Sequence, residues 1–431
     1  MPASKRFYPL LVVATLTACG GASASDGNPS AHSWVIDTIG DTVRVRTQSG
    51  SVWQGNATLV PEMTIGVFEG EDAYMLGNIS AMAVTASGEI YLMDSHVPVL
   101  RKYDASGAHL YDLGREGGGP GEYKSADGGL AVLSDGRVLQ RDPGNGRMNV
   151  YGPDGASITN WRLPGGGGFN TSRKLFRDRQ DNTYSMVLAE LEADVTKWKY
   201  GLVQLTPDGH FTDTTLAPTW DYGRPQISGR REGNSSSTGV PFSPTIKWTF
   251  SPAGYMVGSL TTDYRIDLFR GERDVLRIER DYAPIRVTAA ERDERKRRIT
   301  QNFERQFPGW KWNGPGVPDV KPPIRDLFVG DDGSVWVQVS WVGVATMPAA
   351  EAAAEEKRTG RPQLRFEEPV VFDVFEAGGR FLGQVSTPEG FSVLPHPVFR
   401  RDQVWAVTRD ELDVIRVVRF RVQREDATTG E

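Results

Sequence analysis

The side chains that could carry acid–base or metal chemistry in this sequence are few and widely spaced. Five histidines occur among 431 residues, and none has the i, i+4 spacing that places two imidazoles on one helix face. Asp94 and His96 follow a predicted strand, and His396 lies between two prolines near another predicted strand. Because carboxylates and imidazoles bind divalent metals, we expect these three residues to form a metal or acid–base site if their loops meet.

Several other kinds of site are excluded by the sequence. The only cysteine is Cys19, which excludes disulfides, thiolate metal sites and cysteine nucleophiles. The glycine runs at 117–119 and 165–168 lack the lysine-plus-hydroxyl ending of a phosphate-binding loop, and no Gly-x-Ser-x-Gly motif occurs. A net charge of −6 argues against a nucleic-acid partner, since binding a polyanion requires clustered positive charge.

Aromatic residues in the long segments between predicted strands are the candidate ligand-binding residues. They are Trp198, Trp220, Tyr222, Trp310, Trp312 and Trp341. Exposed aromatic side chains bind sugar faces, peptides and other apolar ligand surfaces. They also commonly hold long loops against a scaffold, and the sequence leaves both roles open. The string WKWNGPG at 310–316 is the most suggestive single patch.

A repeated set of short β-strands must position these residues. A turn pair followed by a β-type run occurs six times, beginning at Ser87, Asp135, Asp181, Ala253, Asp332 and Arg401. Two more strands around another turn follow each of the first five copies, whereas the sixth copy has one further strand at 414–422. Alternating apolar and polar residues bounded by Asp-Gly turns predict antiparallel hairpins, and four strands per repeat predict the blades of a β-propeller.

We therefore predict an all-β chain with one six-bladed β-propeller of four-stranded antiparallel blades over residues 35–426, followed by a disordered tail at 427–431. The alternating segment 41–47 (DTVRVRT) precedes the first blade. We expect this N-terminal strand to close the ring by completing the sixth blade, because closure removes two exposed sheet edges. A pair of β-sandwiches is the alternative arrangement.

One face of such a propeller should carry the long loops. Blade geometry places on that face the connections 115–124, 164–174, 190–199, 219–245, 285–323 and 343–366. Loops on a rigid scaffold concentrate binding residues, so this face is the candidate site. Two insertions are predicted to contain short helices, one with the capping-box spacing of Thr288 and Glu291 and one at about 348–358. The basic side of the first helix is either a solvated face or a contact for an anionic ligand.

The N-terminal residues predict export. Lys5 and Arg6 precede a short apolar run at 7–17, which is typical of a secretory signal peptide over residues 1–18. The run Leu16-Thr17-Ala18-Cys19 resembles the lipobox of bacterial lipoproteins. The resemblance implies cleavage before Cys19, a lipid on its sulfur and a lipidated tether over residues 19–34. A cleaved signal peptide with an incidental cysteine is the alternative.

Parts of the chain resemble a family of bacterial propellers. Segments 90–123 and 138–155 look like NHL-type repeats of six-bladed propellers. The string GREGGGPGEY at 114–123 is similar to one found in many bacterial six-bladed propeller lipoproteins. This resemblance implies a lipid-anchored protein of the cell envelope, at the periplasmic face of the outer membrane or outside it.

Such families share a fold and a location more reliably than an activity. We expect a non-catalytic binding module that takes a glycan, a peptide or a protein on its loop-rich face. The resemblance also implies an alternative, a lactonase-like, metal-dependent hydrolase or lyase that holds a divalent metal in the central channel. A purely structural partner in an envelope assembly is a third possibility.

Overall fold

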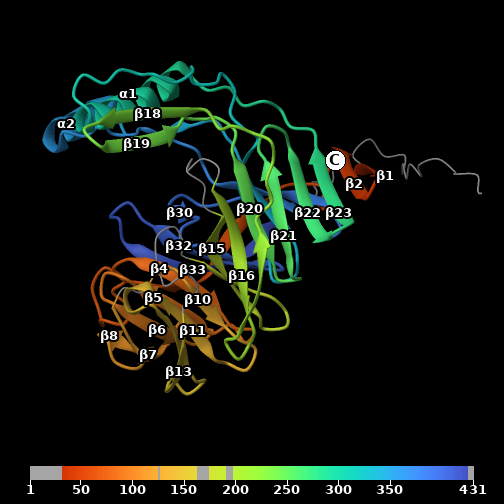
Figure 1. Ribbon diagram of the computed structural model, residues 1–431, viewed down its shortest axis with the longest axis vertical. Coiled ribbons are helices and arrows are strands. Elements are labelled where there is room, and N and C mark those ends of the chain that lie inside the picture. The colour runs from red at the N-terminus through yellow and green to blue at the C-terminus, as the bar shows by residue number, and fades with distance from the viewer. Residues whose placement is uncertain (1–31, 125–126, 163–173, 191–197, 426–431) are drawn as a thin grey trace, which may run out of the picture.

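The computed structural model describes residues 32–124, 127–162, 174–190 and 198–425, and its regular structure is mostly β-strand (Figure 1). The predicted signal peptide, Cys19, nearly all of the tether and the predicted tail lie outside the described residues. No helix in the part of the chain that is described is long and apolar enough to cross a membrane.

Within the described residues, the strands form six groups in which four strands pair in antiparallel order. The first three groups are β4 (Ile79–Val84), β5 (Ile90–Asp94), β6 (Val99–Tyr103) and β7 (His109–Leu113); β10 (Leu130–Val132), β11 (Val138–Asp142), β12 (Arg147–Tyr151) and β13 (Ser157–Arg162); and β14 (Leu175–Arg177), β15 (Thr183–Glu190), β16 (Lys199–Leu205) and β17 (Phe211–Leu216).

The last three groups are β20 (Ile246–Ser251), β21 (Tyr255–Leu260), β22 (Arg265–Gly271) and β23 (Asp274–Arg280); β24 (Ile324–Val329), β25 (Val335–Val339), β28 (Val371–Phe375) and β29 (Phe381–Ser386); and β31 (Val398–Arg400), β32 (Gln403–Arg409), β33 (Ile415–Arg424) and β3 (Ala57–Ile65). The short strand β30 (Phe391–Ser392) also pairs with β32.

Each group begins with a tight hairpin that contains one residue in the left-handed backbone region. The φ angles are 91° at Gly88, 87° at Gly136, 63° at Asp181, 88° at Gly254, 88° at Gly333 and 52° at Arg401. Glycine and, less readily, aspartate adopt this conformation in turns. The six predicted turn pairs are therefore confirmed as the hairpins between the first and second strands of the groups.

The prediction that residues 41–47 complete the sixth blade is wrong. β2 (Thr42–Ser49) pairs in parallel with β23 at the outer edge of the fourth group, and β1 (Ser33–Ile39) pairs with β2. The strand that pairs with β33 is β3, which also pairs over two residues with β29. A register shift between Pro61 and Met63 interrupts the alternation of β3 and explains why strict alternation favoured residues 41–47.

Apolar clusters between neighbouring groups hold the strands in place. Strands β5 (IYLMD) and β25 (VWVQV) are buried at every residue. Between the fifth and sixth groups, the ring of Phe399 stacks on Trp336 at 4.5 Å between centroids and packs against Phe328 at 5.5 Å. Strands buried on both faces are rigid supports for the side chains and loops at their ends.

Three long insertions assemble into one layer, at the upper left of Figure 1. This insertion layer contains α1 (Ala289–Gln306), α2 (Ala349–Thr359) and the hairpin of β18 (Gln226–Arg231) and β19 (Asn234–Gly239). Gln301 of α1 donates a hydrogen bond to Glu356 of α2 at 3.2 Å, and Trp310 Nε1 donates to Ser228 O of β18 at 2.8 Å. Three of the predicted long connections therefore meet in space, namely 219–245, 285–323 and 343–366.

Both predicted helices are present in this layer. Helix α1 begins with the capping box of Thr288 and Glu291, and α2 ends at Gly360 in a left-handed conformation. No sequence pattern predicted the β18–β19 hairpin. The fold also contains three smaller elements: the pair β26 (Val344–Ala345) and β27 (Phe366–Glu367), the pair β8 (Arg115–Glu116) and β9 (Glu122–Tyr123), and the 3₁₀ turn η1 (Pro143–Asn145).

Candidate functional site

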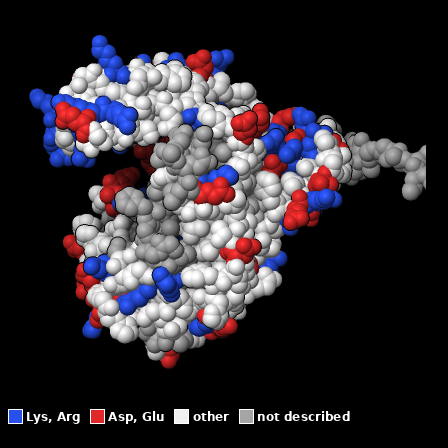
Figure 2. Space-filling model, in the orientation of Figure 1, with Lys and Arg blue, Asp and Glu red and all other residues white. Residues whose placement is uncertain are grey.

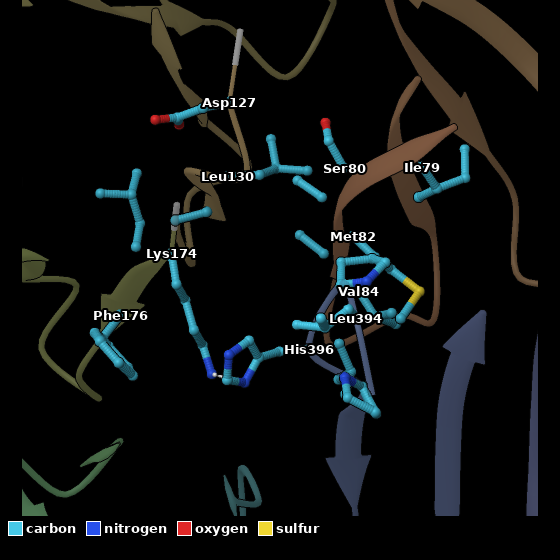
Figure 3. Close-up of a pocket in the computed structure, with 18 of the residues that line it drawn as sticks. Ile79, Ser80, Met82, Val84, Asp127, Leu130, Lys174, Phe176, Leu394 and His396 are labelled. Carbon is cyan, nitrogen blue, oxygen red and sulfur yellow. Dashed lines mark hydrogen bonds between the residues drawn. The ribbon is translucent and has the colours of Figure 1, made fainter. Parts of the chain in front are cut away.

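A cavity of about 1200 Å³ lies where the first strands of the six groups converge. Residues of β4, β10, β14, β20, β24 and β31 line this central cavity, together with the loop at 394–397. Its wall combines polar and charged groups with apolar side chains, among them Met82, Val84, Leu130, Phe176 and Leu394 (Figure 3). Figure 2, in the same orientation as Figure 1, shows a recess between the insertion layer and the strand groups. Concave spaces in which apolar side chains and a few polar groups converge are the usual place for ligands.

Lys174 and His396 meet in this cavity although 222 positions separate them in the sequence. Lys174 immediately precedes β14, and its Nζ donates a hydrogen bond to His396 Nδ1 at 3.4 Å (Figure 3). The ammonium lies 4.8 Å from the ring centroid of Phe176, and the imidazole packs edge-on against Phe328 at 5.3 Å. Because Nδ1 accepts, the proton of the neutral imidazole is on Nε2.

The positive charge and the burial of this pair shift both pKa values downward. The charge of Lys174 lowers the pKa of His396 to about 2, and burial and Lys247 contribute further. Desolvation lowers the pKa of Lys174 to about 8, while Asp326 and Asp331 raise it. At neutral pH the imidazole is therefore neutral, and Lys174 is mostly charged with a minor neutral fraction. The pair can donate hydrogen bonds to a ligand, and the neutral amine can accept a proton.

The remaining charged groups around the central cavity are paired with opposite charges. Arg141 Nη1 lies 2.9 Å from Asp127 Oδ2, and Arg400 Nη2 lies 2.8 Å from Asp331 Oδ2. The lining residues Arg177 and Arg409 form ion pairs with Asp181 and Asp413. The cavity thus presents apolar walls, fixed ion pairs and the Lys174–His396 pair.

Asp94 and His96 do not meet His396 in the structure. The carboxylate of Asp94 accepts hydrogen bonds from the backbone N–H groups of Gly77 at 2.8 Å and of Asn78 and His96 at 2.9 Å each. Burial raises the pKa of Asp94, but these hydrogen bonds outweigh burial and lower it. Arg101 pairs with the same carboxylate at 3.2 Å. This arrangement fastens the loop before β4 to the loop after β5.

Asp142 ends the second strand of its group, as Asp94 does, and has similar contacts. It accepts hydrogen bonds from the N–H of Lys124 at 3.1 Å and from Asn145 Nδ2 at 2.6 Å. A structural role in holding loops therefore accounts for both aspartates. Among the described residues, no group of three or more His, Cys, Asp or Glu side chains is placed to hold a metal ion.

The structure distributes the candidate aromatic residues over several regions, and the contacts of four of them hold loops. Trp220 packs against Phe269 and over Gly258, and Tyr222 Oη donates to Pro244 O at 3.2 Å. The ring of Trp310 packs at a tilt against Phe303 of α1, with 4.9 Å between the ring centroids. Trp312 Nε1 donates to the carbonyls of Gly314 and Pro315, and the ammonium of Lys296 lies 5.4 Å from its ring.

Trp341 contributes backbone groups rather than an exposed ring. Its N–H donates to Glu368 Oε2 at 2.8 Å, and its carbonyl accepts from Lys321 Nζ at 2.9 Å. Its side chain packs against the core beside β24 and β25. Trp198 is half-buried just before β16. None of the six candidate aromatic residues lines the central cavity as far as the described residues define it.

Sequence reasoning singled out His396 but missed its partner Lys174. The lysine is the last residue of a predicted loop, 164–174, and no local pattern distinguishes it from other lysines. The lining strands could have been found, because each is the strand before a predicted turn pair. Lys174 contacts His396, 222 positions away, only because of how the strand groups are arranged in space, so the spacing of residues in the sequence does not predict this contact.

Comparisons with known proteins give the fold and no activity. No protein-family model matches the sequence, and no curated protein matches it either. Among solved structures, a member of the DUF4221 family from Bacteroides vulgatus is similar at 9% identity and a TM-score of 0.51, over 86% of this chain and 99% of that chain. The chain folds as a β-propeller.

Two further structures are similar at lower scores. A gluconolactonase from Xanthomonas campestris has 12% identity and a TM-score of 0.38 over 84% of this chain and 98% of that chain. Regucalcin from Agrobacterium tumefaciens, a calcium-binding protein, has 11% identity and a TM-score of 0.39 over 86% of this chain and 97% of that chain. At these identities neither structure bears on the activity of this chain.

Proposed function

We propose that this chain is a ligand-binding lipoprotein of the bacterial cell envelope, built as a six-bladed, NHL-like propeller whose ring is closed by β3. The central cavity is its binding site, and its ligand is a peptide, either free or as a segment of a partner protein. The lipobox-like run ending at Cys19 supports the anchor and the location. The pairing of β3 with β33 supports closure of the ring.

The observation that carries the binding role is the composition of the central cavity. The apolar part of the mixed wall accommodates side chains, while the ammonium of Lys174 and the Nε2–H of His396 offer donors to peptide carbonyls or a carboxylate. The paired charges around them bring no net repulsion of either sign. Peptide recognition combines these two features, pockets for side chains and hydrogen bonds to the main chain.

A selection from random phage-displayed peptides tests this proposal. We expect enriched peptides whose affinity for the full chain, measured by fluorescence anisotropy, falls about tenfold or more in Lys174→Met and in Leu394→Trp, because one removes a donor and the other fills the cavity mouth. Leu412→Trp is the matched control, since Leu394 and Leu412 are 71% and 77% exposed and only Leu394 lines the cavity. Equal binding by Leu394→Trp would place the peptide site elsewhere.

The Lys174–His396 pair favours a second candidate, a hydrolase or lyase in which the pair moves a proton on the bound ligand. The lowered pKa of Lys174, about 8, suits a general base near neutral pH. Each selected peptide is incubated with the protein, and the mass of the peptide is then measured by mass spectrometry to distinguish the two candidates. Intact peptides support a binding protein, whereas cleavage that His396→Gln abolishes supports the enzyme.

The anchor has its own test. Intact-mass analysis of the protein extracted from membranes of its native host should give a chain that begins at Cys19 and carries a lipid on it. A chain that still begins at Met1 without modification contradicts the lipoprotein proposal.

A further inference from the structure

A second cavity, of about 510 Å³, lies between α1 and the fourth and fifth strand groups. Its apolar walls come from Pro241, Phe242, Ile299, Pro322, Ile324 and Leu364. Its charged residues are Arg295, Arg298, Arg325 and Glu368. We call this space the arginine pocket. It shares no lining residue with the central cavity, so the two cavities are separate candidate sites.

Helix periodicity explains why two of these arginines face the same space. Arg295, Arg298, Ile299 and Asn302 all line the pocket and lie at positions i, i+3, i+4 and i+7 of α1. Residues with this spacing share one face of a helix. Arg325, from β24, lines the pocket from the strand side. Three arginines from two elements that lie apart in the sequence therefore line the same space.

The positive charge of the pocket is not balanced by its carboxylate. Neither Arg295 nor Arg298 forms a hydrogen bond or ion pair with any residue that the structure describes, whereas Arg325 lies 3.7 Å from Glu368. Glu368 in turn accepts from the backbone N–H of Trp341 at 2.8 Å and lies 3.2 Å from the buried Lys321 ammonium. Burial is the main cause of the lowered pKa of Arg295; the charges of Arg325 and Arg298 lower it further, whereas the carboxylates of Glu294 and Glu368 raise it.

The frame of the pocket is rigid. Lys321, which is 2% exposed, donates to Glu291 Oε1 of α1 at 2.6 Å. Glu294 of α1 accepts from the backbone N–H groups of Arg365 at 2.7 Å and Phe366 at 3.2 Å. These contacts fix the helix at its first turns, directly before Arg295 and Arg298. A site fixed in advance loses less conformational entropy when it binds a ligand.

The lining of the arginine pocket also contains a strained residue. Phe242 has a φ of 57°, in the left-handed region that bulky side chains rarely adopt. Its ring lies 5.2 Å from the Lys321 ammonium, which helps to hold it there. Backbone strain of this kind costs about 1–3 kcal/mol and clusters at ligand-binding positions.

We propose that the arginine pocket binds a phosphate monoester that carries a small, partly apolar organic group. Guanidinium groups recognise phosphate through paired N–H···O hydrogen bonds. A phosphate monoester carries close to two negative charges at neutral pH. This charge suits three arginines whose nearby carboxylates are already engaged, Glu368 by Lys321 and Glu294 by the N–H groups of Arg365 and Phe366. Ser243, Thr245 and Thr261 add hydroxyl groups to the lining, and the apolar wall suits the carbon skeleton of the ligand.

Calorimetric titration of the full chain with glycerol 3-phosphate, in low-salt buffer without phosphate, tests this proposal. We expect saturable binding at one site that weakens about tenfold or more in Arg298→Gln, because a charged hydrogen-bonding partner of the phosphate is lost. Arg298 is exposed and unpaired with any described residue, so its replacement should leave the melting temperature unchanged.

Arg297→Gln is the matched control because it removes the same charge from the adjacent position of α1. Arg297 does not line the pocket and pairs instead with Glu356 of α2 at 3.5 Å. Its replacement should change the affinity less than about twofold, in line with a screened surface charge. An equal loss of affinity in both variants would show that the ligand responds only to the overall charge of the helix, and this would overturn the proposal.

A second arm identifies the source of the phosphate monoester. The chain is mixed with phosphatidylcholine vesicles with and without phosphatidic acid, which exposes a phosphate monoester at the membrane surface. Binding of glycerol 3-phosphate alone supports a soluble ligand. Sedimentation with phosphatidic acid vesicles that Arg298→Gln abolishes and Arg297→Gln retains supports a lipid headgroup. Absence of saturable binding in both arms overturns the proposal.

Discussion

The two cavities of this protein are built from similar residue types but differ in how their charges are balanced. Around the central cavity, Arg141 and Arg400 each lie within 3 Å of an aspartate, and desolvation lowers the pKa of Lys174. In the arginine pocket, Arg295 and Arg298 have no such partner among the described residues. We therefore expect the first cavity to select a ligand by shape and hydrogen bonds and the second to select by charge.

The cavities also differ in what supports them. The central cavity is formed by the first strands of all six groups, so the remaining strands should keep its shape when one side-chain contact is removed. The arginine pocket depends on α1, which is attached through Lys321 and its two carboxylate partners and through Glu294, which accepts from the N–H groups of Arg365 and Phe366. Disrupting that attachment should harm one cavity and leave the other, and this separates their roles experimentally.

The largest effect is expected for Lys321→Ala. Lys321 is fully enclosed between Glu291 and Glu368, and its removal leaves two carboxylates of low exposure without their cation. Breaking a buried pair in this way costs about 3–5 kcal/mol of unfolding free energy. Urea denaturation should show this loss, and glycerol 3-phosphate binding should disappear while the peptides selected for the central cavity still bind.

The exposed Lys357 of α2, replaced by alanine, serves as the control, and its effect should stay within about 0.5 kcal/mol. If Lys321→Ala were as stable as this control, α1 would not depend on the Lys321 contacts. Loss of both binding activities at a temperature where the variant is folded would mean that the two cavities are not independent.

The next largest effect concerns the titration of Lys174. Its pKa of about 8 lies well below the ~10.4 of an unfolded lysine, so acylation of this amine followed by mass spectrometry should have its pH midpoint near 8. Between these two values the unfolded chain binds more protons than the folded chain. The contribution of Lys174 to stability therefore rises as the pH increases from about 8 to about 10.4.

A lysine in an unstructured peptide, labelled in the same mixture, provides the reference for this titration. His396→Gln should leave the Lys174 midpoint below that of the reference, because desolvation is the main cause of the shift. A Lys174 midpoint equal to the reference would show that the amine is solvated, and the hydrogen bond to His396 would lose its support.

Local sequence patterns were sufficient for the repeating part of the fold. Turn residues with positive φ, such as Gly88 and Gly333, and the alternation of the strands are local properties, and they identify the hairpins of all six groups. The capping box of α1 is also local, since Thr288 and Glu291 lie within one helical turn. Local patterns could not identify the strand that pairs with the outer edge of β33. Pairing between distant strands is not a local property, and both 41–47 and β3 offered a suitable strand.

The candidate site was only partly predictable because each cavity joins residues that lie far apart in the sequence. His396 stood out through its flanking prolines, whereas Lys174 became important only by desolvation in the folded chain. Similarly, the basic side of α1 was visible in the sequence, but its position beside Arg325 of β24 was not. The tryptophans were conspicuous in the sequence, yet Trp220 and Trp310 are engaged in contacts that hold loops.

The smallest effect is expected for Asp331→Asn, which alters the charge balance of the central cavity. Asp331 raises the pKa of Lys174, so its neutralisation should lower the acylation midpoint of Lys174, by about half a unit or less because the two groups interact through a partly solvated space. The fold should persist, since Arg400 also donates hydrogen bonds to the carbonyls of Thr85 at 2.6 Å and Val84 at 3.1 Å.

Asp413→Asn is the control for this small shift, because Asp413 pairs with Arg409 at 2.8 Å and is not among the charges that act on Lys174. The same midpoint in both variants would mean that Asp331 acts on Arg400 alone. A midpoint that rises in Asp331→Asn would mean that freeing Arg400 changes the cavity more than removing the carboxylate does. Either result would show that the paired charges of the central cavity do not tune its buried lysine, and the contrast with the arginine pocket would then rest on geometry alone.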